Sequence, residues 1–102
     1  MKDIEIYPKN KKHFIKLRIF GKYILKICKK EKIDPIIYGS FMLFYYTKNK
    51  NIKINDLDLY IKEKDFSKLI EVVNRYKIKY HYSKEWHTLQ LLKKDLKIEF
   101  DS

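Results

Sequence analysis

The chain has 102 residues and a net charge of +11, and 45% of its residues are hydrophobic. This size and composition predict one folded domain over residues 1–102 with a real though thin core. No apolar run reaches the roughly 20 residues of a membrane helix, and the charged residues 1–5 do not resemble a signal peptide. A single cysteine, Cys28, excludes an intrachain disulfide and a cysteine zinc site, so we expect a cytoplasmic protein.

Positive charge is concentrated in the first third of the sequence. Residues 1–32 carry eleven Lys/Arg against three Asp/Glu, whereas residues 33–63 balance at four against four. Such a segment fits a surface that meets the phosphates of a nucleotide or a nucleic acid. It fits an A/T-rich coding bias equally well, because all basic residues except Arg18 and Arg75 are lysines, and phosphate readers favour arginine. Both interpretations stay open.

The first predicted element is a long basic amphipathic helix over residues 9–32, preceded by Pro8 and ended by Asp34-Pro35. Its apolar residues recur at steps of three and four, as in a helix that packs one face on a core. They are Phe14, Leu17, Phe20, Gly21, Ile24, Ile27 and Cys28.

A strand-to-helix junction is predicted next. Residues 36–38 form a short apolar run typical of a buried strand, and Gly39-Ser40 follows directly. Residues 41–46 are an unbroken apolar and aromatic block, which predicts a short buried helix. A polar loop is expected over residues 47–51.

The remaining elements are predicted in the second half of the chain. A strand is predicted over residues 54–61, with Asp56, Asp58 and Tyr60 on one face. Asp65 is expected to cap a helix whose core stripe is Phe66, Leu69, Ile70, Val73 and Tyr76. Three further strands are expected over residues 78–82, 88–92 and 96–100, with a turn at Lys94-Asp95. The order α-β-α-β-α-β-β-β predicts an α/β (α+β) fold, a mixed sheet with helices on one side.

Two acidic residues carry the first chemical signal. Asp56 and Asp58, two apart on a strand, point the same way with backbones roughly 7 Å apart. Like charges at half-buried positions cost free energy unless a cation sits between them, and carboxylate oxygens suit Mg²⁺ or Mn²⁺. A solvated strand face would show the same alternation.

A Gly-Ser pair carries the second signal. Gly39 permits close backbone approach, and Ser40 at a helix start leaves free N–H groups for a phosphate. Serine is also a common N-cap with no ligand. The succession of strand, Gly-Ser, helix and Asp-x-Asp strand is much less common than either part alone.

These segments resemble the DNA polymerase β-like nucleotidyltransferases. Their hallmark is a strand, Gly-Ser or Gly-Gly opening a helix, and Asp-x-Asp on the next strand; here Gly39-Ser40 and Asp56-Leu57-Asp58 are separated by fifteen residues. The resemblance runs over residues 33–102 and covers the minimal catalytic core, without a separate base-binding or helical domain. A third carboxylate is usual on a later strand. Glu99, flanked by apolar residues, matches it better than Asp101, although Asp is more usual there.

The resemblance implies a metal-dependent nucleotidyltransferase. It would transfer a nucleoside monophosphate from a nucleoside triphosphate, such as ATP, to a hydroxyl group, using two Mg²⁺ or Mn²⁺ ions. Asp56 and Asp58 would bind both ions, Glu99 or Asp101 would complete the catalytic one, and Gly39-Ser40 would hold the triphosphate. The acceptor stays open: a protein, as in small toxin–antitoxin pairs, a small molecule or an RNA end. The alternative is a non-catalytic module of this fold that binds RNA or a partner protein through the basic helix.

Other residues give weaker signals. His81 and His87 lack the spacing of a zinc site. Trp86 precedes a strand, which favours packing over catalysis, and core filling is favoured over base stacking for Tyr45, Tyr46, Tyr80 and Tyr82. The loop lysines Lys48, Lys50 and Lys53 fit either contacts to a triphosphate or acceptor, or plain solvation.

Overall fold

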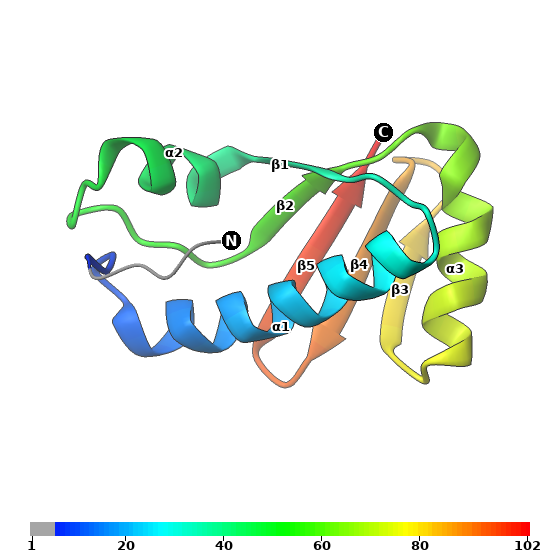
Figure 1. Cartoon of the computed structure of the whole chain (residues 1–102), viewed down its shortest axis with the longest axis horizontal. Helices are drawn as coiled ribbons and strands as arrows, with labels where there is room; N and C mark the ends of the chain where they lie inside the picture. Colours follow the sequence, from blue (N-terminus) through cyan, green and yellow to red (C-terminus); the bar gives the residue numbers. More distant parts are fainter. Residues whose placement is uncertain (1–5) are drawn as a thin grey trace.

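The computed structural model describes residues 6–102, so the expectation for residues 1–5, that they are not a signal peptide, lies outside the described residues. The elements (Figure 1) are α1 (Lys11–Lys30), β1 (Ile36–Tyr38), α2 (Gly39–Thr47), β2 (Leu57–Tyr60), the short 3₁₀ helix η1 (Glu63–Asp65), α3 (Phe66–Arg75), β3 (Lys79–Ser83), β4 (Thr88–Lys93) and β5 (Leu96–Asp101). The predicted α/β order is confirmed, with η1 as an addition. No helix within residues 6–102 is long and apolar enough to cross a bilayer.

A single five-stranded sheet, in the order β1-β2-β5-β4-β3, organises the described chain. β2 and β5 run parallel and the other neighbouring pairs are antiparallel, so the sheet is mixed as predicted. α1 crosses in front of the sheet, and α3 lies beside β3 (Figure 1). The sheet face toward the helices is buried and apolar; it carries Leu57, Leu59, Leu89, Leu91, Ile98 and Phe100. The opposite face, called the open face below, carries the alternate polar residues of the same strands.

The predicted apolar stripe of α1 is buried in full. Near the start of α1, Phe14 stacks on Phe41 of α2 with ring centroids 5.3 Å apart, and it meets Phe44 edge-on at 5.4 Å. Both arrangements are favoured aromatic geometries. α1 therefore fixes α2, and with it the Gly39-Ser40 junction, against the common core.

Two predicted boundaries are wrong because lysines occupy positions where helices usually place glycine. α1 ends at Lys30 because Lys32 adopts a left-handed φ of 60°, and the Ile33 N–H donates to the Cys28 carbonyl at 2.8 Å. α3 ends at Arg75 in the same way, because Lys77 has a φ of 57° and the Ile78 N–H donates to the Val73 carbonyl at 2.9 Å. This motif satisfies the last helix carbonyls. At Lys32 this motif ends α1 at Lys30, before the predicted end at residue 32. At Lys77 the same motif moves the start of β3 from the predicted residue 78 to residue 79.

The strand predicted over residues 54–61 is shorter, so Asp56 precedes β2 and does not lie within it. β5 begins at Leu96, directly after its turn, and β2 pairs with it only from Leu57 onward. The start of α1 supplies the missing hydrogen bonds instead. The Asn10 side chain accepts from the Ile54 N–H at 2.9 Å, and His13 Nε2 lies 2.7 Å from the Asn55 carbonyl oxygen. The segment before Asp56 is thereby tethered to α1.

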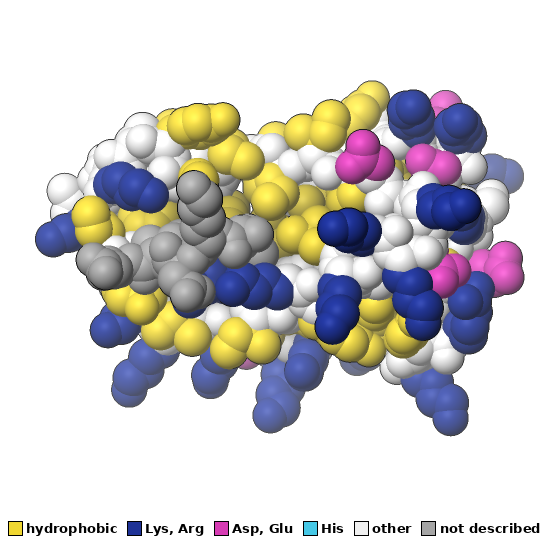
Figure 2. Space-filling model, viewed as in Figure 1, with side chains coloured by type: hydrophobic (Ala, Val, Ile, Leu, Met, Phe, Trp, Pro, Cys, Tyr) yellow, Lys and Arg dark blue, Asp and Glu magenta, His cyan; other side chains and the backbone are white. Residues whose placement is uncertain are grey.

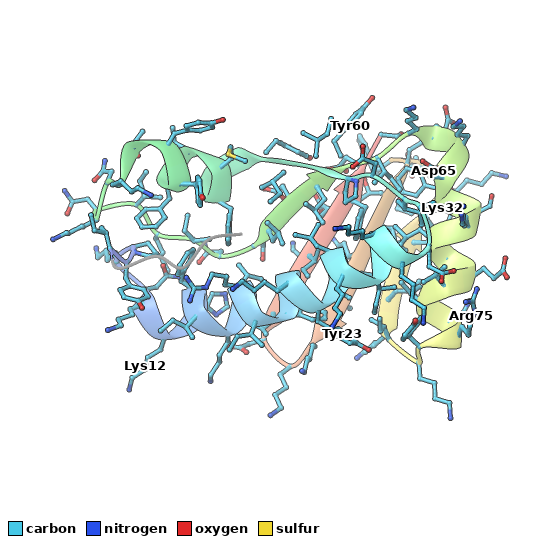
Figure 3. All side chains as sticks on the ribbon, in the orientation of Figure 1. Lys12, Tyr23, Lys32, Tyr60, Asp65 and Arg75 are labelled. Carbon is cyan, nitrogen blue, oxygen red and sulfur yellow. The ribbon has the colours of Figure 1, made fainter. Side chains whose placement is uncertain are left out.

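The predicted cap of α3 is also wrong. Asp65, labelled in Figure 3, makes no side-chain capping bond, because it already has the helical φ and ψ of η1, which runs directly into α3. α3 buries Phe66, Leu69 and Val73 of its predicted stripe. Val72 replaces Ile70 as the fourth fully buried residue, and Ile70 and Tyr76 are only partly buried.

Candidate active site

Gly39 and Asp58 are in direct contact, which joins the two sequence motifs in space. Gly39 is the first residue of α2, directly after β1, and its φ of +74° lies in the left-handed region. A Cβ atom at this position would lie 2.5 Å from Oδ2 of Asp58, far inside van der Waals contact. The Asp58 carboxylate therefore occupies the space that a side chain at residue 39 would need. The predicted strand-to-helix placement of Gly39-Ser40 is confirmed.

Asp58 and Glu99 face each other across the parallel strands β2 and β5. Their backbones are paired in register, and Asp101 follows two residues later, opposite Tyr60. Since residues two apart on a strand share a face, Asp58, Glu99 and Asp101 all lie on the open face. Tyr60 projects away from α1 at the end of β2 (Figure 3). Asp56 lies at the start of this row, where its Oδ2 pairs with Lys97 Nζ at 3.4 Å.

Glu99 and Asp101 differ in how many of their oxygens are already engaged. Both oxygens of Asp101 accept hydrogen bonds: Oδ1 from the Thr88 hydroxyl at 2.9 Å, and Oδ2 from the Tyr38 hydroxyl. Glu99 accepts one bond, from the Gln90 amide at 3.0 Å. Glu99 has the greater free acceptor capacity and also the position opposite Asp58. These features favour Glu99 over Asp101 as the third carboxylate.

The electrostatic field of this row is negative. Burial, reinforced by Glu99, Asp56 and Asp101, raises the pKa of Asp58, while Lys97 acts in the opposite direction. Burial and the bond to Asp101 raise the pKa of Tyr38, so its hydroxyl stays protonated and can donate. A cation that enters a site with these properties lowers its free energy, because the positive charge offsets the repulsion between the carboxylates.

We expect the ligand-free protein to lose stability as the pH rises through the folded-state pKa of Asp58. That pKa lies above the ordinary value of 3.8, so between the two values the folded state binds more protons than the unfolded state. The free energy of unfolding therefore falls as the pH rises through this window. Urea unfolding of wild type and Asp58→Asn over this pH range gives the free energy of unfolding of each protein as a function of pH. The difference between the two curves measures the contribution of Asp58. Parallel profiles would contradict it.

The predicted site residues share one region without forming a closed metal cage. Within residues 6–102, no three His, Cys, Asp or Glu side chains group as a preformed metal site. Asp56 turns toward Lys97, whereas Asp58 and Glu99 remain side by side. Ser40 is the second residue of α2, where N–H groups have no partner within the helix.

Several neighbours of the carboxylates were missed by the sequence reasoning. Thr88 and Gln90 lie opposite Asp101 and Glu99 because the turn at Lys94-Asp95 fixes the register of β4 on β5. That turn was recognised, so the pairing was within reach of the sequence. The contact of Tyr38 with Asp101 depends on the order β1-β2-β5, which no local pattern reveals.

The packing interpretation of Trp86 is wrong, since its side chain is 75% exposed in the turn between β3 and β4. Tyr46 is likewise 79% exposed, contrary to a core role. Tyr45, Tyr80 and Tyr82 do pack against the core. Of the loop lysines, Lys48 lies over the Tyr45 ring at 4.7 Å.

The sequence matches no protein-family model and no curated protein. Solved structures do match, and the chain has the fold of a polymerase β-like nucleotidyltransferase domain.

Three structures illustrate the likeness. A tRNA-processing enzyme in an apo form is 20% identical, with a TM-score of 0.62 over 99% of this chain and 24% of its own. A CCA-adding enzyme in complex with ATP is 18% identical, with a TM-score of 0.62 over 96% of this chain and 24% of its own. A candidate nucleotidyltransferase from Thermotoga maritima is 20% identical, with a TM-score of 0.54 over 84% of this chain and 55% of its own. The chain thus spans about a quarter of the two enzymes.

Proposed function

We propose that the protein is a metal-dependent nucleotidyltransferase that transfers a nucleoside monophosphate from a nucleoside triphosphate to a hydroxyl acceptor. The observation that carries the proposal is the contact of Gly39 with Asp58, with Glu99 opposite on the neighbouring strand. A left-handed glycine that opens a helix against a half-buried carboxylate lets a phosphate chain approach the backbone and a cation at once. The fold supports the same class of reaction.

In this proposal Asp56 and Asp58 would hold two Mg²⁺ or Mn²⁺ ions, and Glu99, with Asp101 as its neighbour, would complete the catalytic one. The ions would stabilise the attacking and leaving oxygens of an in-line displacement. The acceptor oxygen bonds to the α-phosphorus as the bond to the β-phosphate oxygen breaks, and pyrophosphate leaves. The acceptor proton would pass to a carboxylate, for which we propose Glu99. Gly39 and Ser40 would hold the triphosphate through N–H groups of α2.

The carboxylates fit divalent cations by their chemistry. They offer hard oxygen ligands, as Mg²⁺ prefers, and burial together with their mutual repulsion raises the pKa of Asp58. Lys97 partly compensates this charge through its ion pair with Asp56. Metal binding would require that pair to open, which is a modest cost for a half-exposed pair.

Calorimetric titration with each of the four nucleoside triphosphates, with and without Mg²⁺, tests the proposal. We expect saturable binding of at least one triphosphate in the presence of Mg²⁺ and much weaker binding in its absence, because the carboxylates repel bare phosphates. A labelled triphosphate incubated with candidate acceptors then measures transfer. Absence of binding for all four triphosphates would overturn the proposal.

A second candidate function, binding of nucleic-acid phosphates without catalysis, is favoured by the surface of α1. The helix contains no acidic residue, and its lysines extend along the lower edge of the molecule (Figure 2), where Lys12 projects outward (Figure 3). In residues 6–102, no ion pair joins Lys12, Lys16 or Lys26 to a carboxylate. Binding of RNA that falls steeply with salt, needs no Mg²⁺ and is lost on replacing these three lysines by glutamine would support this alternative.

A further inference from the structure

A hollow lined mostly by residues that carry polar groups adjoins the carboxylates on the open face, toward β3. Its volume is about 470 Å³, and it is lined by His81, Ser83, Trp86, Thr88, Gln90 and Glu99. Glu99 thus belongs both to the row of carboxylates and to the wall of the hollow. A ligand in this hollow would lie beside the proposed reaction centre, on the side of Glu99.

Trp86 provides an exposed aromatic surface at this hollow. It lies in the four-residue turn between β3 and β4, and its backbone N–H donates to the Ser83 hydroxyl at 3.4 Å. The Thr88 hydroxyl lies 3.1 Å from the Trp86 carbonyl oxygen and 2.9 Å from Asp101 Oδ1. The single proton of this hydroxyl can go to either oxygen, so Thr88 lies in contact with both the turn and a site carboxylate, and Trp86 lies close to the site. An indole held with so large an exposed area is suited to stacking on a planar ligand.

The other walls offer neutral hydrogen-bonding groups. Gln90 gives one amide N–H to Glu99, which leaves its carbonyl oxygen as an acceptor. His81 and Ser83 contribute a ring nitrogen and a hydroxyl from β3. Exposed bases of single-stranded nucleic acids are recognised by stacking together with such neutral donors and acceptors.

Cations flank the hollow on β3 and its turn. Lys79 shares the face of His81 and Ser83, because alternate residues of a strand point the same way, and Lys84 follows Ser83 in the turn. Both lysines are exposed, and neither forms an ion pair with a carboxylate in the part of the chain that the structure describes. These charges favour a ligand with phosphates and disfavour a polycationic small molecule.

We propose that the hollow is a subsite for the terminal nucleoside of a single-stranded nucleic acid, with its base on Trp86 and its ribose toward Glu99. The preceding phosphates lie toward Lys79 and Lys84. That this nucleoside is the acceptor rests on the proposed function, whereas its binding at Trp86 does not.

Intrinsic fluorescence tests this assignment directly, because Trp86 is the single tryptophan of the chain. Titration with a short oligoribonucleotide, without metal or triphosphate, is expected to quench the emission in a saturable manner. An oligonucleotide with a 3′-phosphate should bind more weakly than one with a 5′-phosphate, since the added charge would lie beside Glu99. Emission that no oligonucleotide changes would overturn the assignment. Quenching by a mononucleoside triphosphate with Mg²⁺ but not by oligonucleotides would assign the hollow to the donor nucleotide instead.

Variants distinguish stacking of a base on Trp86 from general electrostatic attraction of the oligonucleotide to lysines. Trp86→Ala should weaken binding of a labelled oligonucleotide about tenfold, as loss of one stacked base does, and Trp86→Phe should retain most of the affinity. Tyr46→Ala is the matched control, because Tyr46 is equally exposed but lies on α2, outside the hollow. Equal losses in Trp86→Ala and Tyr46→Ala would contradict a specific subsite. Thermal melts check that each variant folds. The calorimetric titration with triphosphates tests the proposed function separately, so a negative result there would leave oligonucleotide binding at Trp86 untouched.

Discussion

Asp58→Asn is expected to abolish the thermal stabilisation of the protein by Mg²⁺ and a nucleoside triphosphate. At roughly a hundredfold excess over Kd, a ligand stabilises the wild type by about 2.7 kcal/mol, which for a domain of this size corresponds to a melting shift of about 10 °C or more. Asparagine keeps the shape of aspartate but removes the anionic oxygens that hard cations prefer. Thermal melts of both proteins, with and without the ligands, measure the difference, and nucleotidyl transfer should be lost with it.

The same variant should leave the stability of the ligand-free protein unchanged or slightly higher, by at most about 1 kcal/mol, since water screens a half-exposed carboxylate. Asp34→Asn, which removes one exposed carboxylate from the loop between α1 and β1, is the matched control and should retain the full ligand shift. Equal ligand shifts in wild type and Asp58→Asn would refute the proposed chemistry. A clear loss of ligand-free stability would indicate that Asp58 has a packing role.

Gly39→Ala is expected to lower stability by about 1–2 kcal/mol through the left-handed backbone of an L-residue, to lower it further through the clash with Asp58, and to disable the site. The new Cβ would lie 2.5 Å from Asp58 Oδ2, so the carboxylate must rotate away from its place opposite Glu99. We therefore expect loss of Mg²⁺-triphosphate binding, measured by calorimetry, beyond what the stability loss explains. Ser40→Ala, which keeps the backbone at the same junction, should bind the triphosphate far better.

A double-mutant comparison separates the two effects of Gly39→Ala. In an Asp58→Ala background no carboxylate remains to clash, so the destabilisation by Gly39→Ala should shrink to the backbone cost alone. The difference between the two backgrounds, measured by urea unfolding, is the coupling free energy of the contact. A destabilisation that is the same in both backgrounds would mean that the contact of Gly39 with Asp58 has no energetic weight.

The element order was predictable because most elements have their own period of apolar residues, and β1 and α2 are unbroken apolar runs. The stripe of α1 and the alternation of β4 and β5 both reflect burial of one face, and burial follows the sequence pattern closely. The ends of elements followed other rules. Lys32 and Lys77 close helices in a conformation that lysine rarely adopts, and Asn10 uses its side chain to hold Ile54 rather than to cap α1.

The candidate site was predictable in its members but not in its contacts. Asp58, Glu99 and Gly39 could be named from motif order, since strand alternation puts acidic residues on one face. Which oxygens are free could not be deduced, because the partners Tyr38 and Lys97 come from the neighbour relations of strands far apart in sequence. The exposure of Trp86 was missed because an aromatic residue beside a strand is usually buried, whereas here it belongs to a turn.

The left-handed lysines also show where this fold tolerates backbone strain. Within residues 6–102, Lys32, Lys48, Lys77 and Lys94 all take a positive φ, where glycine is the residue with least strain. The chain has only two glycines, and one of them is Gly39, where a side chain would displace Asp58. Lysine thus stands in turns that can bear a left-handed backbone, whereas glycine stands at residue 39, where the Asp58 carboxylate leaves no room for a side chain.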